Sequence, residues 1–252
     1  MKIDVIDTKI NNITEELVIE KILLFCNEQE KKEARYICFA NVHMVMEAYD
    51  DKNLQKIINN ADIVAPDGMP LSWYMNKSKN LLYKQTRISG PDTTLKLCEI
   101  SSKQKLKLGF YGSSEKVLEK IKINLLEKFP DIDIKLMISP PFRDLNREEK
   151  ESMINQINKS SIDILFVGLG CPKQEKWMFD HKDRLKCTML GVGAAFDFIA
   201  GDKKMAPLFL QKAGLEWFYR FIQEPKRLWK RYLKHNPRFL LHLIKHNLKY
   251  KG

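Results

Sequence analysis

Residues 162–175 read IDILFVGLGCPKQE, and this stretch decides the fold class. The apolar run predicts a buried strand over Ile162–Val167, because it is short, rich in β-branched and aromatic residues and bounded by glycine. The turn Gly168–Lys173 follows at once and opens a helix. A buried strand that leads through a tight turn into a helix is typical of a parallel sheet. We therefore expect an α/β chain.

The same alternation recurs on both sides of this stretch. Val117–Phe129 is one of the stretches between strands, and its apolar residues follow a helical period. Further strands are predicted over Ile3–Ile6, Tyr36–Ala40, Asp62–Ala65, Lys107–Tyr111, Ile132–Ile138 and Cys187–Gly191. The pattern predicts a Rossmann-like, mostly parallel sheet with helices on both faces, followed by a small helical C-terminal appendage.

Charge divides the chain into two parts. The 252 residues carry a formal net charge of +11, and residues 203–252 hold 13 Lys and Arg against 2 Asp and Glu. This segment therefore accounts for the whole excess, and the remaining 202 residues are neutral overall. We predict a neutral α/β domain over residues 1–202 and a basic appendage over residues 203–252.

Composition excludes several classes of protein. With 44% hydrophobic and 30% charged residues, the chain is neither disordered nor fibrous. Its five cysteines are scattered without a CxxC pair, so we expect no disulfide framework, no zinc site and a reducing compartment. No run of 18 apolar residues and no signal-peptide core occur, so we expect neither a transmembrane helix nor a leader.

Polar residues and glycines follow several predicted strands at the edge where such sheets bind ligands. Asn41 follows the strand that ends at Ala40, and Asp67 stands between Pro66 and Gly68 after the next strand. Gly193 and Asp197 follow the last strand. We expect one composite site there, although an isolated Pro-Asp-Gly is also typical of an ordinary turn.

Two turns suit phosphate, because small residues admit a ligand close to the backbone and a helix N-terminus follows. They are the turn at Gly112 and Ser113 and the turn containing Gly168, Gly170 and Lys173. Neither turn is a Walker A loop, and the second is not a dinucleotide fingerprint, because Lys173 stands where that motif has its third glycine. Each turn, taken alone, is also compatible with a plain tight turn.

The one DxD, over residues 131–133, precedes a predicted strand. It therefore lies at the sheet edge opposite to the predicted site, and we interpret it as a solvated turn. We accordingly predict no metal and no cofactor, and we interpret His43 as a packing or turn residue.

The basic appendage interleaves aromatic residues with Lys and Arg, and Pro207, Pro225 and Pro237 predict three short helices. This pattern favours an anionic membrane surface. Nucleic acid binding and a solvated helix face are the alternatives. We expect no nucleic acid partner, because the rest of the chain has no nucleic-acid-binding module.

Seven segments, taken together, resemble the WecG/TagA/CpsF family of bacterial glycosyltransferases. They are FANVHMV around Asn41, ADIVAPDGMPLSW (61–73), RISGPD around Arg87, GFYGSSEKV (109–117), FVGLGCPKQEKWM (166–178), GVGAAFDFIAGDKKMAP (191–207) and GLEWFYRFIQEPKRLWKRYLKHNPRFL (214–240). The chain departs from the family at Phe39, where the family usually has a Thr, and the sequence leaves the consequence of this change open.

The resemblance implies an inverting enzyme at the inner face of the cell membrane. Such an enzyme transfers N-acetylmannosamine, or a related hexose, from a UDP-sugar to undecaprenyl-pyrophosphate-linked N-acetylglucosamine, for teichoic acid or another cell-surface polysaccharide. It implies Asp67 as the general base, with Arg220 and Arg227 acting near the acceptor pyrophosphate and Arg231 close to a further such position. Nucleotide-sugar contacts are implied for Asn41, Arg87, Gln174 and Asp197.

Two other function classes stay open at this point. One is a Rossmann-type nucleotide-binding enzyme of another class, and the other is a non-enzymatic membrane- or nucleic-acid-binding protein. The sequence also leaves open which UDP-sugar is the donor, which polymer is built and whether a homo-oligomer forms.

Overall fold

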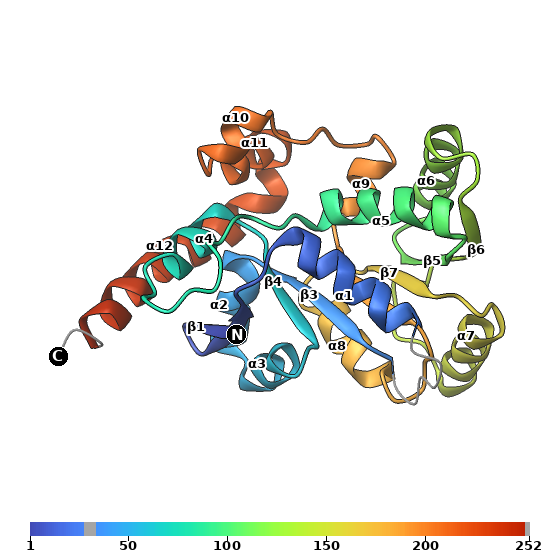
Figure 1. The fold of residues 1–252 in the computed structure, drawn as a ribbon, viewed down its shortest axis with the longest axis horizontal. Helices are drawn as coiled ribbons and strands as arrows, with labels where there is room; N and C mark the ends of the chain where they lie inside the picture. Colours follow the sequence, from blue (N-terminus) through green and yellow to red (C-terminus); the bar gives the residue numbers. More distant parts are fainter. Residues whose placement is uncertain (28–33, 250–252) are drawn as a thin grey trace. The chain divides into compact units, whose positions relative to one another are not determined.

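The structure is a computed structural model that describes residues 1–27 and 34–249. Six strands form one sheet in the order β4-β3-β8-β7-β5-β6, and the pairings from β3 through to β6 are parallel. Helices flank this sheet (Figure 1). The predicted α/β class with a mostly parallel sheet and a helical C-terminal segment is confirmed.

The observed strands of this sheet agree with the predicted ones to within two residues. Strand β7 is buried from Ile164 to Val167, as the continuous apolar run predicted. The strands are β3 (Tyr36–Ala40), β4 (Ile63–Pro66), β5 (Lys107–Gly112), β6 (Asp133–Ile138), β7 (Ile164–Gly168) and β8 (Thr188–Gly191).

The first predicted strand belongs to a separate hairpin. Strand β1 (Lys2–Val5) pairs antiparallel with β2 (Thr8–Asn11), a strand that the sequence analysis did not predict. Both residues of the connecting turn, Ile6 and Asp7, have positive φ, as a type I′ turn requires. Ile6 is an unusual residue for that conformation, so the sequence lacks the Asn-Gly or Asp-Gly signal of such a turn.

The chain divides into two compact units. Unit 2 comprises residues 15–38 and 90–203, and in its core the ring of Phe110 packs against those of Phe166 and Phe196. Its helices are α1 (Glu15–Asn27), α5 (Gly90–Gln104), α6 (Glu115–Lys128), α7 (Arg147–Lys159), α8 (Lys173–His181) and α9 (Ala195–Ile199).

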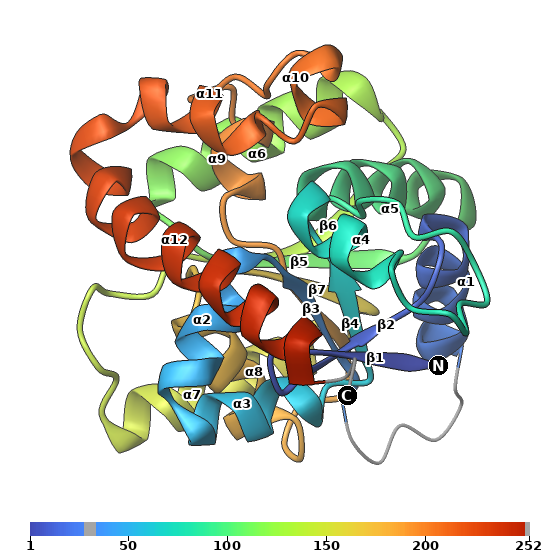
Figure 2. The ribbon, with the colours of Figure 1, turned by 90° about the vertical axis from the view of Figure 1, so that its left-hand side faces the viewer.

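Unit 1 comprises residues 1–14, 39–89 and 204–252. Within it, α12 packs along α2, as Figures 1 and 2 both show. Its helices are α2 (Val42–Asp50), α3 (Lys52–Asn59), α4 (Met69–Met75), α10 (Leu208–Lys212), α11 (Glu216–Gln223) and α12 (Pro225–Lys249). The basic C-terminal segment is thus part of a compact unit, and the functional division at residues 202 and 203 stays a prediction.

The prediction that Pro237 separates two helices is wrong, because α12 runs through this residue. A proline inside a helix removes one backbone hydrogen bond and costs about 3 kcal/mol. Packing outweighs that cost here. His235 and Phe239 on either side are buried, and the guanidinium of Arg238 binds both carboxylate oxygens of Asp50 on α2.

No helix within residues 1–27 and 34–249 combines the length and the apolar character that crossing a bilayer requires.

Candidate active site

Asp67 stands directly after strand β4, between Pro66 and Gly68. Its backbone N–H donates a 2.6 Å hydrogen bond to the carbonyl of Ala40, the last residue of β3, so the neighbouring strand fixes the turn. Gly68 has a φ of +145°, a conformation that favours glycine. The turn therefore holds the Asp67 carboxylate at the carboxyl end of its strand.

Asn41 follows strand β3 and caps helix α2. Its side-chain oxygen accepts a 3.1 Å hydrogen bond from the backbone N–H of Met44, which fixes the orientation of the amide group. Phe39, at the position where the family usually has Thr, is buried within β3.

Arg87 lies in a loop that side-chain amides hold in place. The Asn76 side chain accepts a hydrogen bond from the backbone N–H of Gln85 and donates one to its carbonyl, at 2.8 and 2.9 Å. The buried Gln85 side chain bonds the backbone of Ile13. Ile88 then donates to the carbonyl of Pro66 at 2.8 Å, so Arg87 is carried next to Asp67.

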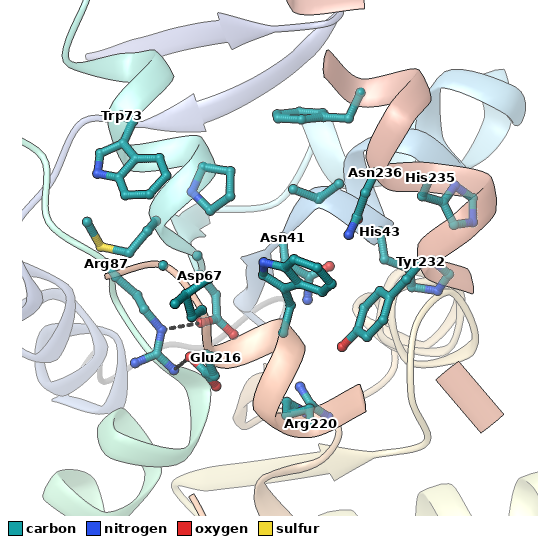
Figure 3. Close-up of a pocket in the computed structure, with 18 of the residues that line it drawn as sticks. Asn41, His43, Asp67, Trp73, Arg87, Glu216, Arg220, Tyr232, His235 and Asn236 are labelled. Carbon is teal, nitrogen blue, oxygen red and sulfur yellow. Dashed lines mark ion pairs between the residues drawn. The ribbon is translucent and has the colours of Figure 1, made fainter. Parts of the chain in front are cut away.

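The guanidinium of Arg87 joins two carboxylates from distant parts of the chain (Figure 3). Its Nε lies 3.3 Å from Asp67 Oδ1, and a terminal nitrogen lies 2.8 Å from Glu216 Oε2 at the start of α11. The other terminal nitrogen donates a 2.8 Å hydrogen bond to Gln211. The two terminal nitrogens of Arg87 thus contact Glu216 and Gln211, while Nε makes the longer ion-pair contact with Asp67. Together these contacts orient the side chain.

These side chains border a pocket of about 340 Å³ within unit 1, a size typical of small-molecule sites. Five of the predicted site residues line it, namely Asn41, Asp67, Arg87, Arg220 and Arg231. Much of the remaining wall is apolar or aromatic and comes from Met69, Trp73, Trp217, Tyr232, Phe239 and Leu240. The pocket combines the carboxylates of Asp67 and Glu216 with three guanidinium groups and aromatic walls.

The arginines of the C-terminal segment occupy different environments. Burial raises the pKa of the Tyr232 hydroxyl, and the charges of Arg220, Arg231 and Arg227 oppose this rise. Arg220 and Arg231 line the pocket together with Tyr232. Arg227 lies outside the lining and pairs with Glu224 at 2.5 Å. Its role near the acceptor pyrophosphate stays a prediction.

Two of the pocket-lining residues, His43 and His235, form a cluster with the neighbouring Glu47. The carboxylate of Glu47 lies 3.1 Å from His235 Nε2 and 3.9 Å from His43 Nδ1. Burial lowers the pKa of His235, while Glu47 raises it and the positive charges of Lys234, Arg231 and Arg238 lower it further. His43, interpreted from the sequence as a packing or turn residue, therefore belongs to a polar cluster at the pocket.

The two turns predicted to bind phosphate touch one another in unit 2. Gly112 has a φ of +126°, and a Cβ atom there would lie 2.7 Å from the carbonyl of Gly168. Glycine is therefore required at position 112. Ser113 follows it and also has positive φ. The first turn leads into α6 and the second into α8, whose first residue is the exposed Lys173.

Gln174 fixes the second of these turns. Its side-chain oxygen accepts a 3.1 Å hydrogen bond from the backbone N–H of Gly170, and its nitrogen donates to the carbonyl of Gly191 at 2.9 Å and to Glu175 at 2.8 Å. Gly193 lies beside the same amide. Gln174 is only 4% exposed, so in this structure it ties the turn after β7 to the end of β8.

Glu175 is a fully buried carboxyl group beneath this turn. Burial raises its pKa from 4.5 to about 7, because a charge is poorly solvated there. Hydrogen bonds from the Gln174 amide and the Cys171 thiol act in the opposite direction. No role for this residue was predicted from the sequence.

Asp197 lies in α9 and forms an ion pair with Lys203. The Asp131–Asp133 pair lies at the amino end of β6, as predicted, and the carboxylate of Asp133 pairs with Lys135 at 3.0 Å. Since β6 runs parallel to β5, these carboxylates lie at the edge opposite to the glycine turns.

No role in the site was predicted from the sequence for Glu216, for Gln211 or for the cluster of His43, Glu47 and His235. Glu216 lies inside the segment 214–240 that carries the family resemblance, which was a usable signal. Nothing local indicates that Gln211 contacts Arg87, because the two are 124 residues apart.

The chain is similar in sequence to known bacterial transferases. A sequence profile described as "Glycosyl transferase WecG/TagA/CpsF family" matches residues 3–252. A protein of Bacillus subtilis (strain 168) named N-acetylglucosaminyldiphosphoundecaprenol N-acetyl-beta-D-mannosaminyltransferase is 28% identical over 217 residues, which cover 86% of this chain and 81% of the relative. A protein of the same name from Staphylococcus aureus (strain MW2) is 29% identical over 252 residues, covering 99% and 95%.

Proposed function

Because the chain belongs to the WecG/TagA/CpsF family of glycosyl transferases, we propose that it transfers N-acetylmannosamine, or a related hexose, from a UDP-sugar to N-acetylglucosamine linked to undecaprenyl diphosphate. The names of the Bacillus and Staphylococcus relatives support both the sugar and the acceptor. The family match favours this function over a nucleotide-binding enzyme of another class and over a non-enzymatic binding protein. The product would serve teichoic acid or another cell-surface polysaccharide.

The observation that carries the proposal is the position of Asp67 in the pocket wall. Its carboxylate is fixed by the turn after β4 and by the guanidinium of Arg87, and it borders a cavity large enough for a sugar ring. In our proposal Asp67 accepts the proton of the acceptor hydroxyl as that oxygen attacks the anomeric carbon. The oxygen enters opposite to the departing UDP, so one displacement inverts the anomeric configuration.

Departure of UDP requires positive charge, because negative charge develops on the leaving phosphate. Arg220 and Arg231 supply guanidinium groups in the same pocket wall. We propose that they stabilise the diphosphate of the donor or of the acceptor. Arg227 would add charge near the acceptor at the surface, where it now pairs with Glu224.

Nucleotide binding is proposed for the glycine turns of unit 2. The close approach of Gly112 to Gly168 leaves backbone rather than side chains at this place, and the N-termini of α6 and α8 follow. Free N–H groups and the helix dipoles favour phosphate there. Lys173, which is exposed, adds a positive charge, and Asp197 is proposed as an acceptor for a hydroxyl of the donor.

The C-terminal segment is proposed to bring the enzyme to its lipid-linked acceptor at the inner face of the cell membrane. Several of its large apolar side chains are exposed, among them Leu208, Phe209, Ile222, Leu233 and Leu240. Lys and Arg residues surround them in the sequence. Apolar residues that enter the interface and basic residues that attract anionic lipids together favour binding to a membrane surface.

The test of the proposal is Asp67→Asn, assayed with a UDP-N-acetylmannosamine donor and a lipid-diphosphate-N-acetylglucosamine acceptor. Asparagine keeps the size of the side chain but accepts no proton, so kcat should fall by about 10²- to 10⁴-fold. Donor binding, measured by calorimetry, should stay nearly unchanged.

Asp62→Asn is the matched control, because Asp62 precedes the same strand that Asp67 follows. This variant should retain wild-type turnover. Near-normal turnover of Asp67→Asn at saturating substrates would refute the assignment of the base. Absence of transfer by the wild-type chain from any UDP-sugar to this acceptor would refute the proposed function.

A further inference from the structure

Three side chains with metal-binding atoms meet beside the pocket, and two of them, His43 and His235, line it. His43 and Glu47 are one helical turn apart on α2, so they share a face of that helix. His235 reaches the same place from α12. Figure 3 shows both histidines on the side of the pocket away from Asp67 and Arg87.

We propose that His43, Glu47 and His235 bind a divalent transition-metal ion, with Zn²⁺ as the preferred ion. Two imidazoles and one carboxylate are a ligand set that such ions take readily, and they leave a coordination position open. Mg²⁺ and Ca²⁺ prefer oxygen ligands, and this cluster offers one carboxylate only.

The distances suit one shared ion. Ligand atoms bind Zn²⁺ at about 2.0–2.2 Å, so two ligands of one ion lie at most about 4.4 Å apart. Glu47 Oε1 lies 3.1 Å from His235 Nε2 and 3.9 Å from His43 Nδ1. All three ligand atoms lie within 4.8 Å of one another, so a small side-chain rotation completes the set.

The scaffold beneath the cluster is firmly held. Asn41 caps the first turn of α2, next to His43. Glu47 follows His43 by four residues on α2. At the end of the same helix, the carboxylate of Asp50 binds both terminal nitrogens of Arg238 on α12. The side chain of His235 is 3% exposed, so its position is fixed by packing. Ligands on two helices that are already joined lose little freedom when an ion binds.

The surrounding charge permits a cation. Three basic side chains act on His235, namely Lys234, Arg231 and Arg238, and they oppose the binding of a positive ion. Asp50 offsets two of them, because it pairs with both Arg238 and Lys234. Glu47 supplies a negative charge directly at the proposed position.

Two consequences follow for the molecule. Coordinate bonds from α2 and α12 to one ion would join the C-terminal helix to the helix after β3, so the ion would stabilise unit 1. Since His43 and His235 both line the pocket, the open coordination position would be accessible to a ligand in the pocket. The ion is not part of the proposed transfer step, which uses Asp67 and the arginines.

The experiment uses the full chain, freed of metal with a chelator and then titrated with Co²⁺. Cobalt bound by nitrogen and oxygen ligands absorbs visible light, so binding is followed directly, and Zn²⁺ should displace it at one ion per chain. Zn²⁺ should also raise the melting temperature, whereas Mg²⁺ should not.

Glu47→Gln is the decisive variant, because it removes a ligand at a partly exposed position and preserves the size of the side chain. Mutation of a residue that hydrogen-bonds to a metal ligand lowers the affinity for the metal about 10- to 100-fold. Loss of the ligand itself should therefore weaken metal binding by at least about 100-fold. His235→Asn should act likewise, and circular dichroism reports whether each variant folds.

His242→Asn is the matched control, a histidine on the same helix outside the cluster, and it should bind cobalt as the wild type does. Failure of the wild type to bind one Co²⁺ or Zn²⁺ per chain would overturn the proposal. Equal binding by folded Glu47→Gln and by the wild type would overturn it as well.

Discussion

Replacing Glu175 with glutamine should make the protein more stable above neutral pH. The pKa of this buried carboxyl rises from 4.5 to about 7 in the folded protein. Between these two pH values the folded chain keeps a proton that the unfolded chain has lost, so stability falls as the pH rises through this window. One pH unit corresponds to about 1.4 kcal/mol. The free energy of unfolding of the wild type is therefore lower at pH 8 by about 3 kcal/mol, because it falls as the pH rises from 4.5 to about 7.

Glutamine does not ionise, and its side-chain oxygen can still accept the hydrogen bond from Gln174. The free energy of unfolding of Glu175→Gln should therefore exceed that of the wild type by about 3 kcal/mol at pH 8. At pH 4.5 the two proteins should be nearly equal, because the wild-type carboxyl is then protonated in the folded state and half-protonated in the unfolded state.

Urea denaturation followed by circular dichroism at pH 4.5 and pH 8 measures both differences. Glu149→Gln is the control, because the pKa of this exposed carboxyl is lowered to about 2 by Arg143, and the variant should gain no stability at pH 8. If Glu175→Gln gains nothing at pH 8 relative to pH 4.5, the carboxyl is not held protonated by burial and the reasoning fails.

Three further predictions concern the transfer reaction and the membrane. Transfer should persist in EDTA, because the DxD lies at the edge opposite to the glycine turns; activity lost to EDTA and restored by Mn²⁺ or Mg²⁺ would contradict this. Arg220→Ala should lower kcat more than Arg227→Ala, since only the first lines the pocket, while vesicle binding should weaken by about 1 kcal/mol in each. Equal and small losses of turnover in the two variants would mean that both arginines act only as surface charges. The double variant Leu208→Ser with Phe209→Ser should bind anionic vesicles at least about tenfold more weakly, as measured by sedimentation. Each of these apolar side chains contributes about 1.5–3 kcal/mol when it is buried. The control is Phe142→Ser, which changes an apolar side chain of unit 2 that is 95% exposed and should leave vesicle binding unchanged.

The parallel sheet could be predicted from the sequence because its strands are continuous apolar runs bounded by glycines and polar residues. Strand β7 and the turn after it are the clearest case. The hairpin strand β2 was missed because Ile6 occupies a turn position that usually takes Asn, Asp or Gly. The low helix propensity of proline predicted a break at Pro237, but α12 continues through this residue because it packs on α2.

The site could be predicted only where its residues follow strands or match family segments. Asp67 and Arg87 were predicted in this way, and in the structure Arg87 Nε lies 3.3 Å from Asp67 Oδ1. Contacts made across long stretches of chain have no local signature. For this reason the contacts of Glu216 and of the cluster around Glu47 could be identified only from the structure. The same holds for the side chain of Gln174, which bonds the backbone of the turn after β7 and of the last residue of β8.

The order of unit 1 along the chain has a consequence for biosynthesis. Its pocket is lined by residues from Asn41 to Leu240, so about 200 residues of chain separate its first wall from its last. A ribosome that adds about 5–20 residues per second needs ten seconds or more to cover that interval. Unit 2 has all of its residues once residue 203 has been added, whereas α2 waits for α12, the helix that packs on it. The pocket is therefore completed only after α12 has been synthesised, later than the last residue of unit 2.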